Sequence, residues 1–131
     1  VEDVKESRGK HYVIIDSGIH HLGGMSGLGR IPRNTVEFER ILAAASAGTA
    51  NGEMMTCDIV GPLCTPLDCL TSNARMPELR PGDVLQVRNV GAYGLTASLI
   101  HFLSREAPAE VVVHGETVVH ASRIQYSRER V

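Results

Sequence analysis

The segment GPLCTPLDCL, residues 61–70, places a cysteine and an aspartate on one short stretch interrupted by prolines. A free cysteine most often fills a core as a small hydrophobe. Prolines that end strand pairing, and the polar neighbours Thr65 and Asp68, instead predict a partly exposed thiol at Cys64. Such a thiol can donate a proton or attack an electrophile. Cys57 and Cys69, on either side, are the better candidates for core positions.

Histidines are the natural partners of a reactive thiol, and the chain has 6 of them. Cys64, one histidine and Asp68 could compose the nucleophilic set of a thiol-dependent hydrolase, but nothing in the sequence links the three in space. His20 and His21 are adjacent, so we expect their side chains to diverge, one exposed and one packed or hydrogen-bonded. They are not expected to share a metal, and no metal site is predicted.

The segment GAYG, residues 91–94, presents a tyrosine between glycines at the end of an expected strand. Tyr93 could be a tyrosine packed at a turn. Alternatively, its hydroxyl could meet a ligand anion, because flanking glycines let backbone and ligand approach closely. The Gly-rich segment 22–30 lacks the GK[ST] ending of a phosphate loop, so we interpret it as a flexible loop.

Composition narrows the classes of protein. The chain of 131 residues is long enough for one core and suggests one domain. With no Trp, 4% aromatic residues and a net charge of -2, it offers neither a base-stacking surface nor a basic field for nucleic acid or lipid. The absence of a long apolar run or signal peptide predicts a cytoplasmic protein without a membrane segment. An odd set of 3 cysteines without a CxxC pair predicts reduced thiols.

The periodicity predicts an all-β fold, a small Greek-key-type β-barrel or sandwich with one or two short helical turns in the regions 17–33 and 63–70. Short β-branched runs bounded by Gly, Pro and charged residues favour strands. The last two runs, separated by His114-Gly115-Glu116, predict a hairpin. The expected strands lie within 11–17, the start of 35–48, 53–60, 84–90, 109–113 and 117–123.

Four segments taken in order resemble one known family. They are YVIIDSGIHH, GPLCTPLD, LRPGDVLQVRNVGAYG and PAEVVVHG. Together they are similar to the C-terminal β-domain of the fold-type III pyridoxal-phosphate decarboxylases, the ornithine, arginine and diaminopimelate decarboxylase family. The resemblance runs from about residue 4 to residue 123.

The resemblance implies that residues 1–131 are the C-terminal β-barrel domain of a decarboxylase that uses pyridoxal 5'-phosphate. In that family a separate N-terminal α/β barrel binds most of the cofactor and supplies the Schiff-base lysine. The β-domain completes the site across a homodimer interface. Lys5 and Lys10, the only lysines, do not lie where the family carries that residue. We therefore expect a domain that is inactive without the barrel.

The resemblance also implies roles for individual residues. Cys64 matches the family cysteine that enters the partner subunit's active site and helps control reprotonation of the carbanion. Tyr93 matches a tyrosine whose hydroxyl lies beside the cofactor. Asp68 matches an aspartate placed at the subunit interface, so we expect it to have a structural or pairing role.

Thr65 is the residue most informative about substrate. Ornithine and diaminopimelate enzymes carry an acidic residue directly after the cysteine, where it meets the distal ammonium of the substrate, and this chain has Thr65 there. The segments HHL, GLGR, GPLCTPLD and GAYGLTAS are more similar to the branch found in specialised-metabolite pathways. Some members of that branch decarboxylate an aminoacyl group held on an acyl carrier protein, which is the partner we expect. The alternative is a non-catalytic β-domain that serves as an assembly or interaction module.

Overall fold

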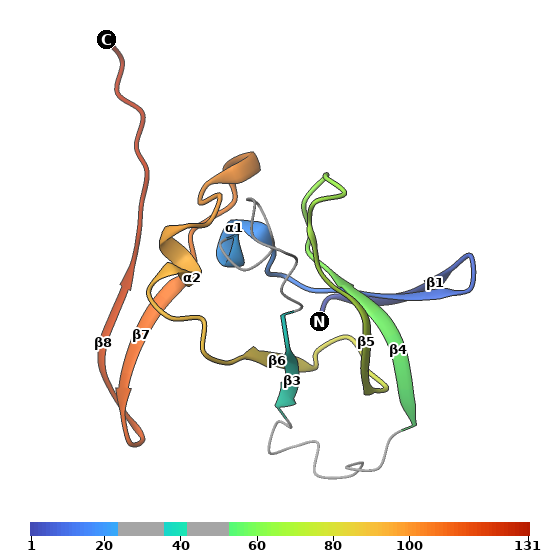
Figure 1. Ribbon diagram of the computed structural model, residues 1–131. Coiled ribbons are helices and arrows are strands. Elements are labelled where there is room, and N and C mark those ends of the chain that lie inside the picture. Colours follow the sequence, from blue (N-terminus) through green and yellow to red (C-terminus); the bar gives the residue numbers. More distant parts are fainter. Residues whose placement is uncertain (24–35, 42–52) are drawn as a thin grey trace.

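The main sheet contains four of the strands seen in the computed structural model, which describes residues 1–23, 36–41 and 53–131 (Figure 1). Its order is β1-β2-β4-β5, with β2 and β4 parallel and the outer pairs antiparallel. A two-residue turn, Arg8-Gly9, joins β1 to β2 with both residues at positive φ, as a tight hairpin requires. The four strands are β1 (Asp3–Ser7), β2 (Lys10–Ile14), β4 (Met54–Val60) and β5 (Cys69–Pro77).

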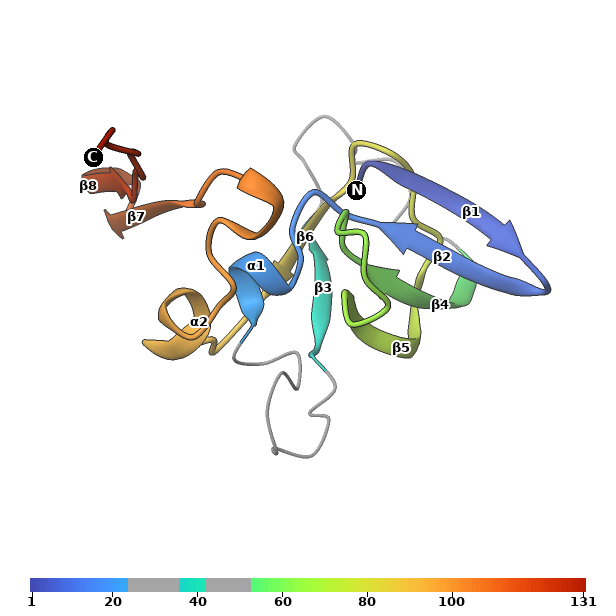
Figure 2. The same ribbon diagram turned by 90° about the horizontal axis from the view of Figure 1, so that it is seen from above.

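Two smaller sheets complete the described strands. β3 (Phe38–Ile41) pairs with β6 (Val84–Val87), and β7 (Ala109–His114) pairs with β8 (Thr117–Arg123), both antiparallel. The helical pieces are α1 (Ile19–Leu22), α2 (Tyr93–Thr96) and the 3-10 turn η2 (Phe102–Ser104). In both views α1 and α2 lie between the main sheet and the β7–β8 hairpin (Figures 1 and 2).

The core forms where the central part of β4 packs beside the end of β2, and the residues around the buried apolar side chains are themselves partly or fully buried. Val13 and Ile59 are opposite each other in the sheet and fully buried, and Cys57 lies two residues before Ile59 on the same face. The segments after β2 and β4 add to this cluster, so α1 and the loop beyond β4 are anchored in the core. Its buried members are Val13, Ile15, Ile19, Cys57, Ile59, Leu63, Leu70, Met76 and Leu79.

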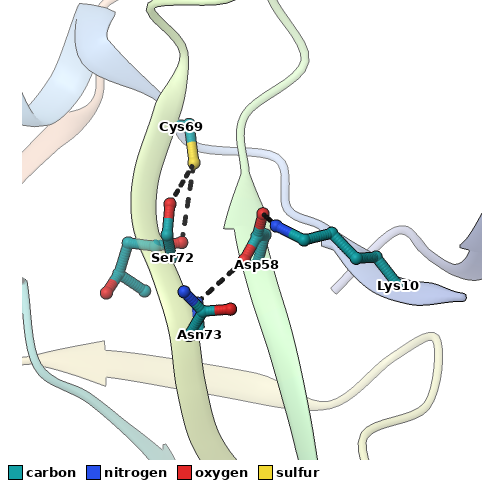
Figure 3. A network of polar contacts seen from close by, with 6 residues as sticks. Lys10, Asp58, Cys69, Ser72 and Asn73 are labelled. Atoms are coloured by element: carbon teal, nitrogen blue, oxygen red, sulfur yellow. Dashed lines mark hydrogen bonds and ion pairs between the residues drawn. The ribbon is translucent and has the colours of Figure 1, made fainter.

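A polar network crosses the main sheet where the pairing of β4 with β5 is irregular. The register shifts between Cys57 and Ile59, and Asp58 at this point accepts the backbone N–H of Asn73 at 2.8 Å. Lys10 reaches the other oxygen of Asp58 at 3.2 Å from β2 (Figure 3). The carboxylate therefore replaces a missing ladder partner, and the ammonium offsets its charge.

The all-β class with short helical turns is confirmed, as are the strands at 38–41, 54–60, 84–87 and the final hairpin. Of the two predicted forms, barrel or sandwich, the described strands do not form a closed barrel. Closure requires the edge strands to pair, whereas β1 and β5 are the edges of an open sheet. The predicted helical turn in the region 63–70 is absent, because the chain forms bends and a turn before β5 begins at Cys69. We did not predict the outer strands β1 and β5. Residues 42–52, and 24–30 of the Gly-rich loop, lie outside the described residues.

Within the described ranges, no helix has both the length and the apolar character needed to cross a membrane.

Candidate functional site

Cys64 lies at the exposed tip of the loop from Gly61 to Asp68, as the sequence predicts. The loop is closed at its base by the Gly61 N–H, which donates to the Asp68 carbonyl at 2.8 Å. Within it, the Thr65 N–H donates to the Leu63 carbonyl at 2.8 Å, and the Asp68 N–H donates to the Thr65 carbonyl at 3.1 Å. Leu63 is buried in the core, so the loop is anchored by one side chain while the next presents its thiol to solvent.

Asp68 organises this loop from the inside. Its buried carboxylate accepts the Leu63 N–H and the Ile19 N–H, each at 2.7 Å. A Cβ on Gly61 would lie 2.6 Å from Asp68 Cγ, and a Cβ on Gly18 would overlap the same carboxylate. Two glycines therefore give the backbone room to wrap this carboxylate, which explains both Gly18 and the Gly that opens the loop.

The bond to Ile19 joins the Cys64 loop to α1. Gly18, the residue before α1, has no side chain to cap the helix, and Asp68 supplies the acceptor from 49 residues away in sequence. Sequence reasoning gave Asp68 a structural or pairing role but did not identify this contact. The sequence feature that could have indicated this contact was the pair of glycines, Gly18 and Gly61, that surround the Asp68 carboxylate. Its expected place at a subunit interface stays a prediction.

The adjacent histidines lie within α1. His20 is only 2% exposed, and its Nδ1 has no hydrogen-bond partner. Burial lowers its pKa, the neighbouring His21 lowers it further, and the Asp68 carboxylate opposes both. His21 is half-buried and contacts Ser17 Oγ at 3.1 Å and the Glu106 carbonyl at 3.3 Å.

The prediction that these two side chains diverge is wrong. Their ring centroids are 3.8 Å apart, because the two residues lie on a helical turn and not on extended backbone. The described residues contain no group of His, Cys, Asp or Glu side chains able to hold a metal ion.

Tyr93 opens α2 and is 77% exposed, so it is not packed at a turn within the described chain. The Gly91 before it has φ of 60°, and a Cβ on Gly94 would lie 3.1 Å from Val90, so both glycines are needed for this turn. The segment after α2 is fastened to α1 by the Leu99 N–H, which donates to the Ile19 carbonyl at 3.3 Å. The phenol is therefore held at the surface by an ordered turn.

Three of the four candidate residues come together, and one does not. Cys64, Thr65 and Asp68 share one loop, whereas Tyr93 begins α2, which lies on the other side of α1 from the main sheet in both views (Figures 1 and 2). An apolar groove of about 520 Å³ runs beside α1 and α2, lined in part by His21, Gly91, Gly94 and Leu95. Cys64 and Tyr93 do not line this groove. Any site that used both would need surfaces from outside the described chain.

The other cysteines are placed differently. Cys57 is buried, as predicted, and burial followed by the nearby Asp58 charge raises its pKa. Cys69 is only partly buried, so its assignment to the core is wrong. Its thiol lies 3.6 Å from the Thr71 carbonyl and 3.3 Å from Ser72 Oγ, beside the Asp58 network (Figure 3).

An open sheet with a thiol-bearing loop tied to a short helix defines a known class of domain. A family described as "Pyridoxal-dependent decarboxylase, C-terminal sheet domain" matches residues 1–91 by its sequence model. The crystal structure of AQ1208 from Aquifex aeolicus is similar with a TM-score of 0.76 at 29% identity, over 90% of this chain and 27% of that chain. The chain belongs to this family of C-terminal sheet domains.

Two curated relatives are similar in sequence. L-glutamyl-[BtrI acyl-carrier protein] decarboxylase of Niallia circulans is 42% identical over 108 residues, which are 82% of this chain and 25% of that protein. Diaminopimelate decarboxylase of Methanothermobacter thermautotrophicus is 32% identical over 128 residues, which are 97% of this chain and 27% of that protein. The chain thus spans about a quarter of the length of these relatives.

Proposed function

We propose that this chain is the sheet domain of a pyridoxal-phosphate-dependent amino-acid decarboxylase and completes the active site across a homodimer interface. An N-terminal α/β barrel of the same polypeptide binds the cofactor. The family match over residues 1–91 and the two decarboxylase relatives support this assignment. The free state of all 3 cysteines is consistent with a cytoplasmic location.

The residues of this chain can contribute side chains to such a site, but they are not placed to attach the cofactor covalently. Anchoring needs a lysine amine, and the only lysines are Lys5 and Lys10. Lys5 is exposed on β1, and Lys10 is paired with Asp58 across the main sheet. The groups presented outward are the thiol of Cys64 and the phenol of Tyr93.

When bound, pyridoxal phosphate would supply the electron sink that the loss of an α-carboxylate as carbon dioxide requires. Cys64 then donates the proton of its thiol to the substrate's α-carbon and is reprotonated from solvent. The loop holds its backbone fixed, so the thiol reaches one face of the carbon. Tyr93 donates a hydrogen bond from its hydroxyl beside the cofactor. Both residues act from the surface of this domain on a site built with other chain segments.

The substrate we propose is an aminoacyl group attached to an acyl carrier protein. Thr65 follows Cys64 directly, is uncharged, and its Oγ1 accepts the Leu67 N–H at 3.3 Å inside the loop. It offers no carboxylate to a distal ammonium. An acyl group linked through a thioester carries no such charge at its attached end, and the Niallia circulans relative is named for a carrier-bound substrate.

The observation that supports the proposal most directly is the exposed thiol on a loop locked by a buried aspartate. The test uses the full-length protein with its barrel. Carbon dioxide loss is followed by mass spectrometry for free amino acids and for the same amino acids on a carrier protein. We expect turnover of the carrier-bound form. Turnover of free diaminopimelate or ornithine alone would contradict the substrate assignment, and no turnover with bound cofactor would contradict the enzyme assignment.

The role of Cys64 has its own test. In full-length Cys64→Ala we expect slower decarboxylation or misplaced protonation, with cofactor absorbance unchanged. Cys69→Ala is the matched control, because Cys69 lies five residues away on β5 with its thiol turned to the strand. Equal turnover and identical products in the two variants would refute the assignment.

A further inference from the structure

The β7–β8 hairpin is the one described sheet whose residues are all exposed. It stands away from the main sheet, beyond α2, in both views (Figures 1 and 2). Its turn is well formed, with Gly115 at φ of 62°, and the ion pair of Arg123 with Glu106 at 2.9 Å ties its open end to the preceding segment. The hairpin is thus an ordered surface and not a loose tail.

The two faces of this hairpin differ in chemistry. Val111 lies opposite Ala121, and Val113 lies opposite Val118, so these four side chains share one face. The opposite face carries Glu110, Val112 and His114 from β7, with Ser122, His120 and Thr117 as their partners. The pairing shifts by one residue between Val112 and Val113, so the exposed Val119 has no direct partner on β7. We call the first face the valine face. Apart from Arg123, already paired at its end, the valine face carries no charge.

An apolar face of this kind is not stable in water. A two-stranded hairpin alone is marginal, and contiguous apolar patches on a protein surface mark places where another surface packs. Val113 is 60% exposed and Val118 is 58% exposed, so most of the area that burial would stabilise is still open. Burial of this face by a further surface would therefore be favourable.

The absence of charge on the valine face favours a permanent partner surface over a transient one. Transient partners are steered by complementary charges, whereas permanent interfaces have apolar centres depleted of charge. The archaeal relative aligns with 97% of this chain, so its match includes this hairpin, and it is nearly four times as long. About three quarters of that relative therefore lies outside the part that this chain matches.

We propose that the valine face is an intramolecular docking surface, covered by an apolar patch of the N-terminal barrel of the same polypeptide. This inference rests on the proposed function for the existence of that barrel. It assigns the hairpin the task of fixing the sheet domain to the barrel, separately from the loop that presents Cys64.

Neighbouring valines on opposite faces test the proposal in the full-length protein. Val112 is 53% exposed and Val113 is 60% exposed here, so the described chain alone predicts similar accessibility. Single variants Val112→Cys and Val113→Cys are alkylated with iodoacetamide, and each site is read by peptide mass spectrometry. In the folded protein, we expect the Val113→Cys thiol to react at least about tenfold more slowly than the Val112→Cys thiol. After denaturation, the two thiols should react at equal rates. Equal rates in the folded protein would overturn the proposal.

The identity of the partner surface is read separately. Val113→Leu, produced with photo-leucine, keeps an aliphatic side chain and forms cross-links on irradiation. Photo-leucine enters every leucine position, so only cross-links that peptide mass spectrometry assigns to residue 113 are counted. Cross-links from residue 113 to residues preceding Val1 in the same polypeptide support the proposal. Cross-links from residue 113 to a second copy or to an added carrier protein would overturn it. Neither readout requires turnover, so a protected valine face in a protein without decarboxylase activity would defeat only the proposed function.

Discussion

Replacement of Asp68 is the sharpest test of how this domain presents its thiol. Asp68→Asn keeps the shape of the side chain but turns one acceptor oxygen into a donor. One of the two N–H groups, of Leu63 or of Ile19, then faces another donor in a buried position. Asp68→Ala removes both acceptors and leaves both N–H groups without a partner.

The size of the effect follows from these two bonds. Both are 2.7 Å long, end on one carboxylate and are buried. A hydrogen bond to a charged group contributes about 1.5–3 kcal/mol, so Asp68→Ala should lower the free energy of unfolding by about 3–6 kcal/mol, and Asp68→Asn by about half of that. Because domains are stable by only about 5–15 kcal/mol, the alanine variant should come close to unfolding.

The assay is urea denaturation of the full-length protein combined with alkylation of Cys64. We expect Asp68→Asn to lower the urea midpoint and to change the alkylation rate of Cys64, since the loop loses its internal anchor. Asp58→Asn is the control, because Asp58 also accepts a backbone N–H but lies in the main sheet. It should lower the midpoint while leaving the Cys64 rate unchanged. A wild-type midpoint and a wild-type Cys64 rate in Asp68→Asn would refute the reasoning.

Three further predictions concern the same part of the fold. Gly61→Ala should lower the free energy of unfolding by about 1–3 kcal/mol, measured by urea denaturation, because its Cβ would press on Asp68. His20 has a lowered pKa, so the unfolded chain binds its proton more readily than the folded chain does, and stability should fall as pH drops through about 6.5. His20→Asn should lessen that fall, whereas the exposed His114→Asn should not, as thermal unfolding at pH 7.5 and 5.5 would reveal. Thr65→Glu should raise turnover of substrates with a distal ammonium relative to carrier-bound ones in competition assays, and an unchanged ratio would contradict the role given to Thr65.

The exposed position of Cys64 and the all-β class could be predicted from the sequence because both depend on local chemistry. Prolines interrupt pairing wherever they occur, and β-branched runs favour strands with little help from distant residues. The final hairpin was predictable for the same reason, since its turn and both strands lie within 15 consecutive residues. The roles of Cys64, Tyr93 and Thr65 in chemistry stay predictions.

The features that the sequence did not predict depend on contacts between residues that are far apart in the chain. The bond from Ile19 to Asp68 joins residues 49 apart, and the close, tilted contact of the His20 and His21 rings depends on a helical turn that this bond caps. The strands β1 and β5 were not predicted, because their sequences contain many polar residues and they become recognisable as strands only through their pairing with β2 and β4. Local sequence determined where the chain bends and which side chains it exposes. Only the tertiary structure decided which glycines surround Asp68, because a buried carboxylate takes its partners from whatever segments the fold brings to it.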